Sequence, residues 1–173
     1  GDHPVDIVED LAERSLGALQ HAPDVFVHSQ VLLCRAIDAL TRGRIDDARR
    51  TVAELNRYSD QIGNPRTQAF SLYMRAYLHM YLEEFEEAIE FADRAAALAP
   101  DPFDRLCALG IKGTALTLMN RAEGGLDVLS QVRAEIQSGN FLMLYLFVDV
   151  PYGAALVLAG RMSEGVQFIE AAI

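Results

Sequence analysis

The residue types that most often carry enzyme chemistry are scattered along this chain. The four histidines are His3, His21, His28 and His79, and none stands in the H-E-x-x-H spacing of a helical zinc site. There is also no glycine-rich phosphate loop and no Gly-x-Ser-x-Gly turn that would present a nucleophilic serine. We therefore predict that the chain is not an enzyme and binds neither a metal ion nor a cofactor, although a larger parent protein could carry a separate catalytic domain.

The two cysteines, Cys34 and Cys107, lie too far apart in the sequence to form a zinc-binding pair. Each stands in an apolar pattern with helical spacing, which favours two buried, reduced thiols over one disulfide bond. The first residues are acidic and amphipathic and do not form the apolar core of a signal peptide. Both observations predict a cytoplasmic location.

A dense group of carboxylates begins at Glu83 and comprises Glu83, Glu84, Glu86, Glu87 and Glu90. A calcium site would need oxygen ligands wrapped on a loop with a tight glycine turn, which this stretch lacks. The acids instead open an alanine-rich segment, where negative charge is favourable at the positive end of a helix dipole. We therefore interpret the group as a solvated helix start.

The composition limits the kinds of partner. The 173 residues are 51% hydrophobic, enough for the core of one domain, and their formal net charge is −10. Nucleic acids and anionic membrane surfaces need a basic face, so this charge disfavours both.

The apolar run from Phe141 to Gly160 is long enough to span a bilayer. It contains Asp149 and Pro151 and ends in the register of an internal repeat, so we interpret it as a buried helix. Pro151 is expected to kink this helix or begin a fresh turn, and Asp149 to cap that break or point into a polar groove.

Helical periodicity extends over the whole chain, because apolar residues recur every three or four positions and strand patterns are almost absent. Clusters such as Gly63-Asn64-Pro65 and Pro100-Asp101-Pro102 mark the helix ends. The predicted helices span residues 4–20, 25–42, 45–62, 66–82, 85–98, 103–119, 122–137, 141–159 and 162–173. The connections are short, which makes successive helices antiparallel neighbours.

Four segments align with one another, at residues 41–52, 81–92, 118–129 and 158–169. In each segment a helix ends, two polar residues turn the chain, and an apolar residue opens the next helix. Two aligned positions are small in every copy: Ala36, Ala76, Gly113 and Gly153 before the turn, and Ala48, Ala88, Gly125 and Gly165 after it. Small residues at these positions predict close packing within each hairpin, and a regular spacing predicts hairpins stacked as a solenoid.

This pattern resembles the tetratricopeptide repeat (TPR) family. Residues at the family spacing are Phe85, Ala88, Ala95 and Pro100 on the second helix and Gly113 and Gly153 on the first. The chain departs from the family pattern in lacking Trp, in repeats longer than about 34 residues, and at the usual leucine site, which holds Arg75, Lys112 and Tyr152. The resemblance implies an all-α, right-handed solenoid of antiparallel hairpins, a single domain over residues 1–173 with a leading helix at 4–20 and repeats at about 25–62, 66–99, 103–138 and 141–173.

Long, alanine- and arginine-rich repeats of this type are similar to those of bacterial nucleotide cyclases and maltose-regulator-type ATP-dependent transcription regulators. The resemblance therefore implies a regulatory or scaffold fragment of a larger bacterial signalling protein. The array has no polar capping helix at its end, which predicts that it can also form a homodimer through its uncapped ends.

The first helix of each hairpin lines a concave groove in the TPR family. The family's groove positions correspond to Gln30, Leu33, Ile37, Leu40, Thr41, Phe70, Tyr73, Tyr77, Met80, Tyr81, Cys107, Gly110, Thr114, Thr117, Leu118, Phe147, Val150, Ala154, Val157 and Leu158. Our candidate partner-binding residues are Phe70, Tyr73, Tyr77, Met80, Tyr81, Phe147 and Asp149.

The tyrosines Tyr73, Tyr77 and Tyr81 follow an i, i+4, i+8 spacing and so lie along one helix face. They either line the groove or pack between repeats, and the sequence leaves both alternatives open. The lining has no ladder of lysine and asparagine for an acidic peptide tail. It favours an apolar or amphipathic helix from a partner protein or another domain of the parent. The alternative is a small molecule held by Tyr73, Tyr77 and Asp149.

Overall fold

The structure is a computed structural model that describes residues 4–21, 24–141 and 144–172. This part of the chain is all-helical and contains no β-strand. Its nine helices are α1 (Pro4–Leu19), α2 (Val25–Thr41), α3 (Ile45–Ile62), α4 (Pro65–Tyr81), α5 (Phe85–Leu98), α6 (Pro102–Leu118), α7 (Ala122–Gly139), α8 (Tyr145–Leu158) and α9 (Met162–Ala172). The predicted all-α fold class and helix order are confirmed.

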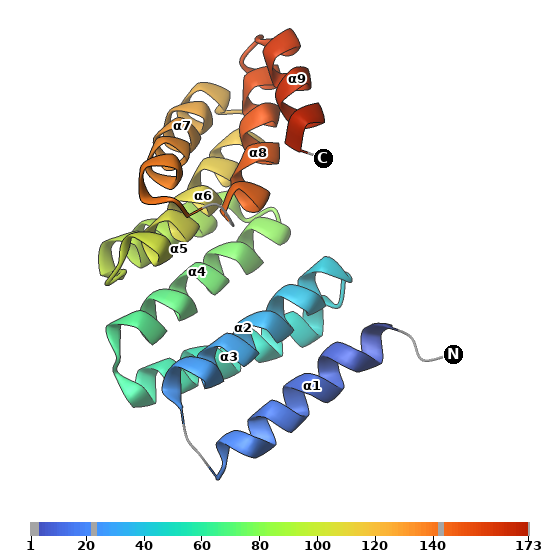
Figure 1. Cartoon of the computed structure of the whole chain (residues 1–173), viewed down its shortest axis with the longest axis vertical. Coiled ribbons are helices and arrows are strands. Elements are labelled where there is room, and N and C mark those ends of the chain that lie inside the picture. Colours follow the sequence, from blue (N-terminus) through green and yellow to red (C-terminus); the bar gives the residue numbers. More distant parts are fainter. Residues whose placement is uncertain (1–3, 22–23, 142–143, 173) are drawn as a thin grey trace.

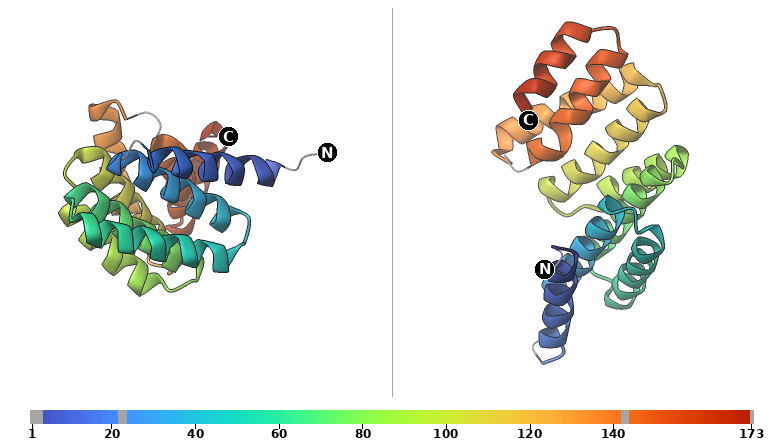
Figure 2. Two further views of the ribbon diagram at one scale, coloured as in Figure 1. Left: turned by 90° about the horizontal axis from the view of Figure 1, so that it is seen from below. Right: turned by 90° about the vertical axis from the view of Figure 1, so that its right-hand side faces the viewer.

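The helices form stacked hairpins. They follow one another along the long axis of the molecule, from α1 at the lower end to α9 at the upper end (Figures 1 and 2). The hairpins are α2–α3, α4–α5, α6–α7 and α8–α9, and α1 packs against α2. The first helices also contact one another in the order α2, α4, α6, α8, and each second helix contacts the first helix of the next hairpin. This arrangement is that of a TPR-like helical solenoid.

The core consists of two apolar clusters that follow one another along the stack. One apolar cluster surrounds Leu32, Leu55 and Met74 and draws on α2 to α6, and a second surrounds Leu129 and Ile136 and draws on α6 to α8. Helix α6 belongs to both clusters, because it contributes side chains to each. Helix α6 therefore connects the apolar cluster of the earlier hairpins with that of the later ones.

Polar caps set the start of the first helices in three hairpins. The side chain of Asp24 accepts a hydrogen bond from the Val27 amide at 2.8 Å. Asn64 and Asp101 cap α4 and α6 in the same way, and in both helices a proline occupies the first turn, where its missing N–H has no cost. Asn64 and Asp101 belong to the two proline-containing clusters that mark helix ends in the sequence.

The turn inside each hairpin also repeats. Four residues at equivalent positions have positive φ angles: Gly43 (69°), Glu83 (61°), Asn120 (61°) and Gly160 (83°). Glycine adopts this left-handed conformation without a steric penalty, whereas Glu83 does so at some cost. The same backbone turn is thus kept even where the glycine is absent.

The predicted close packing inside the hairpins is confirmed. Gly125 and Gly113 face each other, because a Cβ atom added to Gly125 would lie 2.9 Å from the carbonyl oxygen of Gly113. Gly165 and Gly153 form the same contact, with a corresponding distance of 2.6 Å. In the earlier hairpins alanines occupy these positions and are fully buried, namely Ala36, Ala48, Ala76 and Ala88.

The eighth helix differs from its prediction at two points. It begins at Tyr145, whereas we expected Phe141, which lies outside any helix; residues 142–143 fall outside the described residues. It also runs through Pro151 without a break, so no fresh helix starts there. Proline removes only one helical hydrogen bond, and the flanking residues Val148 and Leu156 are buried in the second cluster and hold the helix together. Among the described helices, none combines the length and the apolar character that a bilayer crossing requires.

Candidate functional site

An apolar groove of about 670 Å³ runs along the described part of the chain. Its walls come from α2, α4, α6 and the start of α8, the first helices of four successive hairpins. The lining residues are Gln30, Leu33, Cys34, Ile37, Phe70, Tyr73, Met74, Tyr77, Met80, Tyr81, Phe103, Leu106, Cys107, Gly110, Ile111, Thr114, Leu118, Leu144, Phe147, Val148 and Pro151. None of these residues is charged, so the groove offers apolar contact and a few neutral polar groups.

Helical spacing explains why one face of each first helix reaches the groove. On α2, for example, Gln30, Leu33, Cys34 and Ile37 recur every three or four residues and share one side. A different side of the same helix presents the buried Ala36 to the interior of its hairpin. A helix that is apolar on two sides normally packs on two sides, and here one of those sides faces the groove.

The tyrosine stripe runs from the core to the surface along α4. Tyr73 is 9% exposed, Tyr77 is half-buried and Tyr81 is 40% exposed, and all three line the groove. Phe70 meets Tyr73 edge-on with ring centroids 5.6 Å apart, and Tyr77 meets Tyr81 in the same manner at 5.1 Å. The two alternatives that the sequence left open therefore coexist, because each ring packs against its neighbours and still contributes to the groove wall.

Two of these tyrosine hydroxyls are held neutral. Burial raises the pKa of Tyr73 well above its ordinary value, and nearby Cys107 and Asp104 add to the effect. Burial also raises the pKa of Tyr77, together with the adjacent Tyr81 hydroxyl. A tyrosine hydroxyl is already protonated at neutral pH, and these shifts extend its protonated range further into alkaline pH.

Six of the seven candidate partner-binding residues line the groove: Phe70, Tyr73, Tyr77, Met80, Tyr81 and Phe147. Asp149 does not, because its Oδ1 accepts a hydrogen bond from Arg133 Nε on α7 at 2.8 Å. The Arg133 guanidinium in turn lies over the rings of Tyr152 and Phe168, at 4.8 and 4.2 Å. Asp149 thus has the partner that a partly buried carboxylate needs, and it ties α8 to α7.

The family positions locate the groove well on α2, α4 and α6 but poorly on α8. Positions that do not line it are Leu40, Thr41, Thr117, Val150, Ala154, Val157 and Leu158. Lining residues that the sequence did not indicate are Cys34, Met74, Phe103, Leu106, Ile111, Leu144, Val148 and Pro151. The groove closes against the beginning of α8, so it uses that helix's first residues instead of its whole length. The only sequence signal for the added residues is their spacing of three or four from the predicted ones.

The cysteines are both free, as predicted, but they are not both buried. Cys34 is exposed and Cys107 is half-buried, because both lie on the groove side of their helices, which no further layer covers. Desolvation raises the pKa of the Cys34 thiol. Desolvation, helped by the charges of Asp104 and Asp101, raises the pKa of Cys107 to about 12. Neither thiol is therefore activated as a nucleophile.

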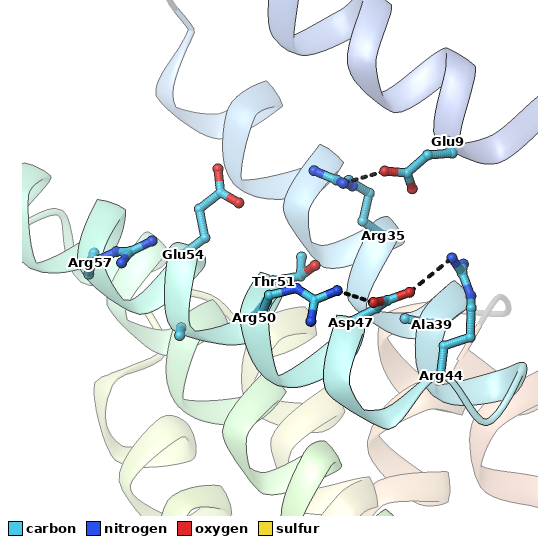
Figure 3. Close-up of a pocket in the computed structure, with 10 residues that line it drawn as sticks. Glu9, Arg35, Ala39, Arg44, Asp47, Arg50, Thr51, Glu54 and Arg57 are labelled. Carbon is cyan, nitrogen blue, oxygen red and sulfur yellow. Dashed lines mark hydrogen bonds and ion pairs between the residues drawn. The ribbon is translucent and has the colours of Figure 1, made fainter.

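A second hollow, of about 620 Å³, lies between α1, α2 and α3 (Figure 3). Its walls carry four arginines (Arg35, Arg44, Arg50 and Arg57) and three acids (Glu9, Asp47 and Glu54). Arg35 on α2 pairs with Glu9 on α1, and Asp47 on α3 receives both Arg44 and Arg50. Its contacts attach α1 to the solenoid.

The carboxylate group at the start of α5 lies on the surface, as predicted. Glu86 and Glu87 occupy the first turn of α5, and all five acids are exposed. Glu84 pairs with the His79 ring at 2.7 Å. Within the described part of the chain, no three His, Cys, Asp or Glu side chains are grouped closely enough to hold a metal ion.

A comparison with protein families matches residues 69–102 to the family described as tetratricopeptide repeat. The matched segment covers most of α4, all of α5 and the loop that leads to α6. This hairpin carries the tyrosine stripe, and the match supports the TPR-like character of the repeat. Neither the curated proteins nor the solved structures include a match to the chain.

Proposed function

We propose that this chain is a non-catalytic protein-interaction module whose groove receives an apolar or amphipathic helix from a partner protein or from another domain of its parent. The observation that carries the proposal is the groove itself, an uncharged hollow lined by the first helices of four successive hairpins. TPR repeats generally mediate contacts between proteins, which agrees with this assignment.

The dimensions of the groove suit one face of a helix. Four neighbouring helices at spacings of about 8–10 Å give a length of roughly 25–30 Å, which equals about 16–20 helical residues. A helix about 10 Å wide occupies roughly 120 Å³ per residue, so a hollow of about 670 Å³ accepts the inward side chains of such a helix but not its full thickness.

The rim of the groove exposes large apolar side chains. Phe147 is 60% exposed, Leu118 is 55% exposed and Tyr81 is 40% exposed. Exposed apolar groups that gather around a hollow mark interaction sites more often than scattered ones, and aromatic residues supply much of the binding energy there.

A peptide selection tests this function. A displayed library of 20-residue helical peptides is selected on the folded domain, and the dissociation constants of the enriched peptides are measured by fluorescence anisotropy. We expect Phe147→Ala and Tyr77→Ala to weaken binding at least about tenfold while helicity is retained. The matched control is Met162→Ala on α9, which is 61% exposed and lies outside the groove. Equal losses in Phe147→Ala and Met162→Ala would show that the groove is not the interface.

A second candidate function is the sensing of a small neutral ligand. Its support is the groove's volume, which lies within the range of about 300–1,000 Å³ usual for ligand pockets, and the two neutral tyrosine hydroxyls in its wall. In this alternative Tyr73 and Tyr77 hold the ligand without Asp149, which pairs with Arg133. Mass spectrometry of material released from denatured, freshly purified protein separates the two functions, because only the second predicts a bound small molecule.

The type of parent protein, the cellular location and self-association are also part of the proposal. The compositional resemblance to arrays in bacterial cyclases and ATP-dependent transcription regulators supports a cytoplasmic regulatory role in a larger signalling protein. The exposed Val166 on α9 supports self-association at that end of the solenoid. Sedimentation of wild type and a Val166→Glu variant tests it, since a monomeric wild type would contradict the homodimer.

A further inference from the structure

Helix α6 carries a glycine that the packing of the solenoid does not explain. Gly110 stands in the middle of α6, where it is buried and lines the groove. Glycine destabilises the interior of a helix relative to alanine, because it loses more conformational freedom on folding. Its presence at this position therefore calls for a physical reason.

Close approach of the two helices of a hairpin is not that reason. A Cβ atom added to Gly113 would lie 2.6 Å from Leu129 Cγ, so the hairpin requires a glycine there. Within the described part of the chain, a Cβ atom added to Gly110 would meet one atom outside its local backbone, Val148 Cγ2 at 3.4 Å. That distance is an ordinary van der Waals contact, so the fold has room for a methyl group at Gly110.

The repeat does not keep this position small either. Three residues before the small residue of each first helix stand Leu33 on α2, Tyr73 on α4, Gly110 on α6 and Val150 on α8. Leu33 and Tyr73 line the same groove as Gly110. The missing side chain on α6 therefore leaves a recess in the floor of the groove, between the tyrosines of α4 and the first residues of α8.

The surroundings of this recess are apolar and aromatic. Tyr77 lines the α4 wall, and the buried Val148 and the 60%-exposed Phe147 line the α8 wall. The Thr114 hydroxyl, one helical turn from Gly110, already donates to the Gly110 carbonyl oxygen at 2.8 Å. None of the lining residues is charged, so a charged group would lose its hydration without gaining a counter-charge. A large apolar side chain would instead gain from burial and from edge-on contacts with the rings.

We infer that Gly110 determines the specificity of the groove, and that the helix bound there inserts one large apolar side chain, such as Leu, Met, Phe or Trp, over this residue. The inference rests on the proposed function, because it names the class of residue that anchors the bound helix. It also explains why α6 keeps a residue that lowers its stability, since the space is filled in the complex and not in the free protein.

Parallel selections on the wild type and on Gly110→Ala test the inference, with the displayed library described above. The added methyl group fits the free protein but occupies the space of the anchor. We expect the peptides selected on the wild type to share one large apolar position and to bind Gly110→Ala about 5- to 30-fold more weakly. Trimming that position from Phe to Leu, or from Leu to Val, should narrow the difference between the two proteins. Replacing it by Ala should weaken binding to the wild type at least about 30-fold.

Gly124→Ala is the matched control. It makes the same change in α7, where no atom of the described residues lies within 4 Å of the added Cβ, and it lies outside the groove. This variant should bind the peptides as the wild type does. Both variants should unfold at the same urea concentration as the wild type or a higher one, since alanine favours a helix. A lower unfolding midpoint together with weaker binding in Gly110→Ala would show that Gly110 serves the packing against Val148, and would overturn the inference.

The outcomes separate the two proposals. Peptides that lose affinity for Phe147→Ala but bind Gly110→Ala as tightly as the wild type would leave the groove as the interface and overturn the role of Gly110. Enriched peptides without a shared large apolar position would do the same. A selection that enriches no peptide, or only peptides indifferent to Phe147→Ala, would overturn the proposed function and this inference with it.

Discussion

Two adjacent glycines in α7 provide a sharp test of the packing that defines each hairpin. Gly125 lies against α6, whereas a Cβ atom on its neighbour Gly124 would have no atom within 4 Å. The two residues share a helix and a sequence context. Changing each one to alanine therefore makes the same chemical change in two different packing environments.

The expected effects have opposite signs. A methyl group on Gly125 would lie 2.9 Å from the Gly113 carbonyl oxygen and 3.0 Å from the Thr117 nitrogen, both backbone atoms that cannot move aside. It would also press on the Thr117 hydroxyl, which donates to that same carbonyl at 2.8 Å. Overpacking costs about 1–3 kcal/mol and loss of the hydrogen bond about 1 kcal/mol, against a gain of up to about 1 kcal/mol in helix propensity. We expect Gly125→Ala to lower the free energy of unfolding by about 2–3 kcal/mol, and Gly124→Ala to raise it by about 0.5–1 kcal/mol.

Urea denaturation followed by far-UV circular dichroism measures the difference. With a urea m-value of about 2 kcal/mol per molar, the two variants should differ by about 1.5 M in their unfolding midpoints. If Gly125→Ala is as stable as Gly124→Ala, the helices do not approach as closely as described. If both variants lose stability equally, the effect comes from the backbone of α7 and not from its contact with α6.

Two further predictions concern a buried carboxylate and a strained turn. Burial, assisted by Asp101 and opposed by Arg66, raises the pKa of Asp104 to about 6. The unfolded chain titrates near pH 4, so the contribution of Asp104 to stability is fully present below that pH and is lost as the pH rises through 6. Relative to the wild type, Asp104→Asn should therefore become more stable by about 2–3 kcal/mol between pH 4 and pH 7 in urea titrations, and a constant difference would contradict the assignment. In the α4–α5 turn, Glu83→Gly should raise the free energy of unfolding by up to about 1 kcal/mol, because φ is positive at this position. Glu86→Gly inside α5 should lower the free energy of unfolding by about 0.5–1 kcal/mol. Thermal unfolding of the two variants distinguishes relief of backbone strain from a general effect of removing charge.

The sequence predicts the helices accurately because their signals are local. Apolar periodicity, capping residues and prolines act within a few positions, and eight of the nine helices accordingly begin within one residue of their predicted positions. The exception is α8, whose predicted start at Phe141 rested on a continuous apolar run without a capping residue. Positive φ at Glu83 and Asn120 was not predicted either. Asparagine adopts this conformation more often than other non-glycine residues, whereas glutamate rarely does.

The candidate site is less predictable because it depends on contacts between distant residues. The sequence does not show a partner for Asp149, so it was a candidate ligand-binding residue. In the structure Arg133, which stands sixteen positions earlier, donates a hydrogen bond to it. Cys34 looked buried because its helix is apolar on two sides, and a sequence pattern does not show that one of those sides is left uncovered.

The repeat itself explains why the fold is easier to predict than the partner. Inside the hairpins the equivalent positions stay small in every copy, because both helices must approach closely there. The groove positions do not repeat: Tyr73 and Tyr77 on α4 correspond to Gly110 and Thr114 on α6. Bulky side chains on one helix and small ones on the next deepen the groove over α6. The features shared by the copies thus build the solenoid, and the features that differ between them shape the groove, so recognition depends on the residues that a repeat pattern does not constrain.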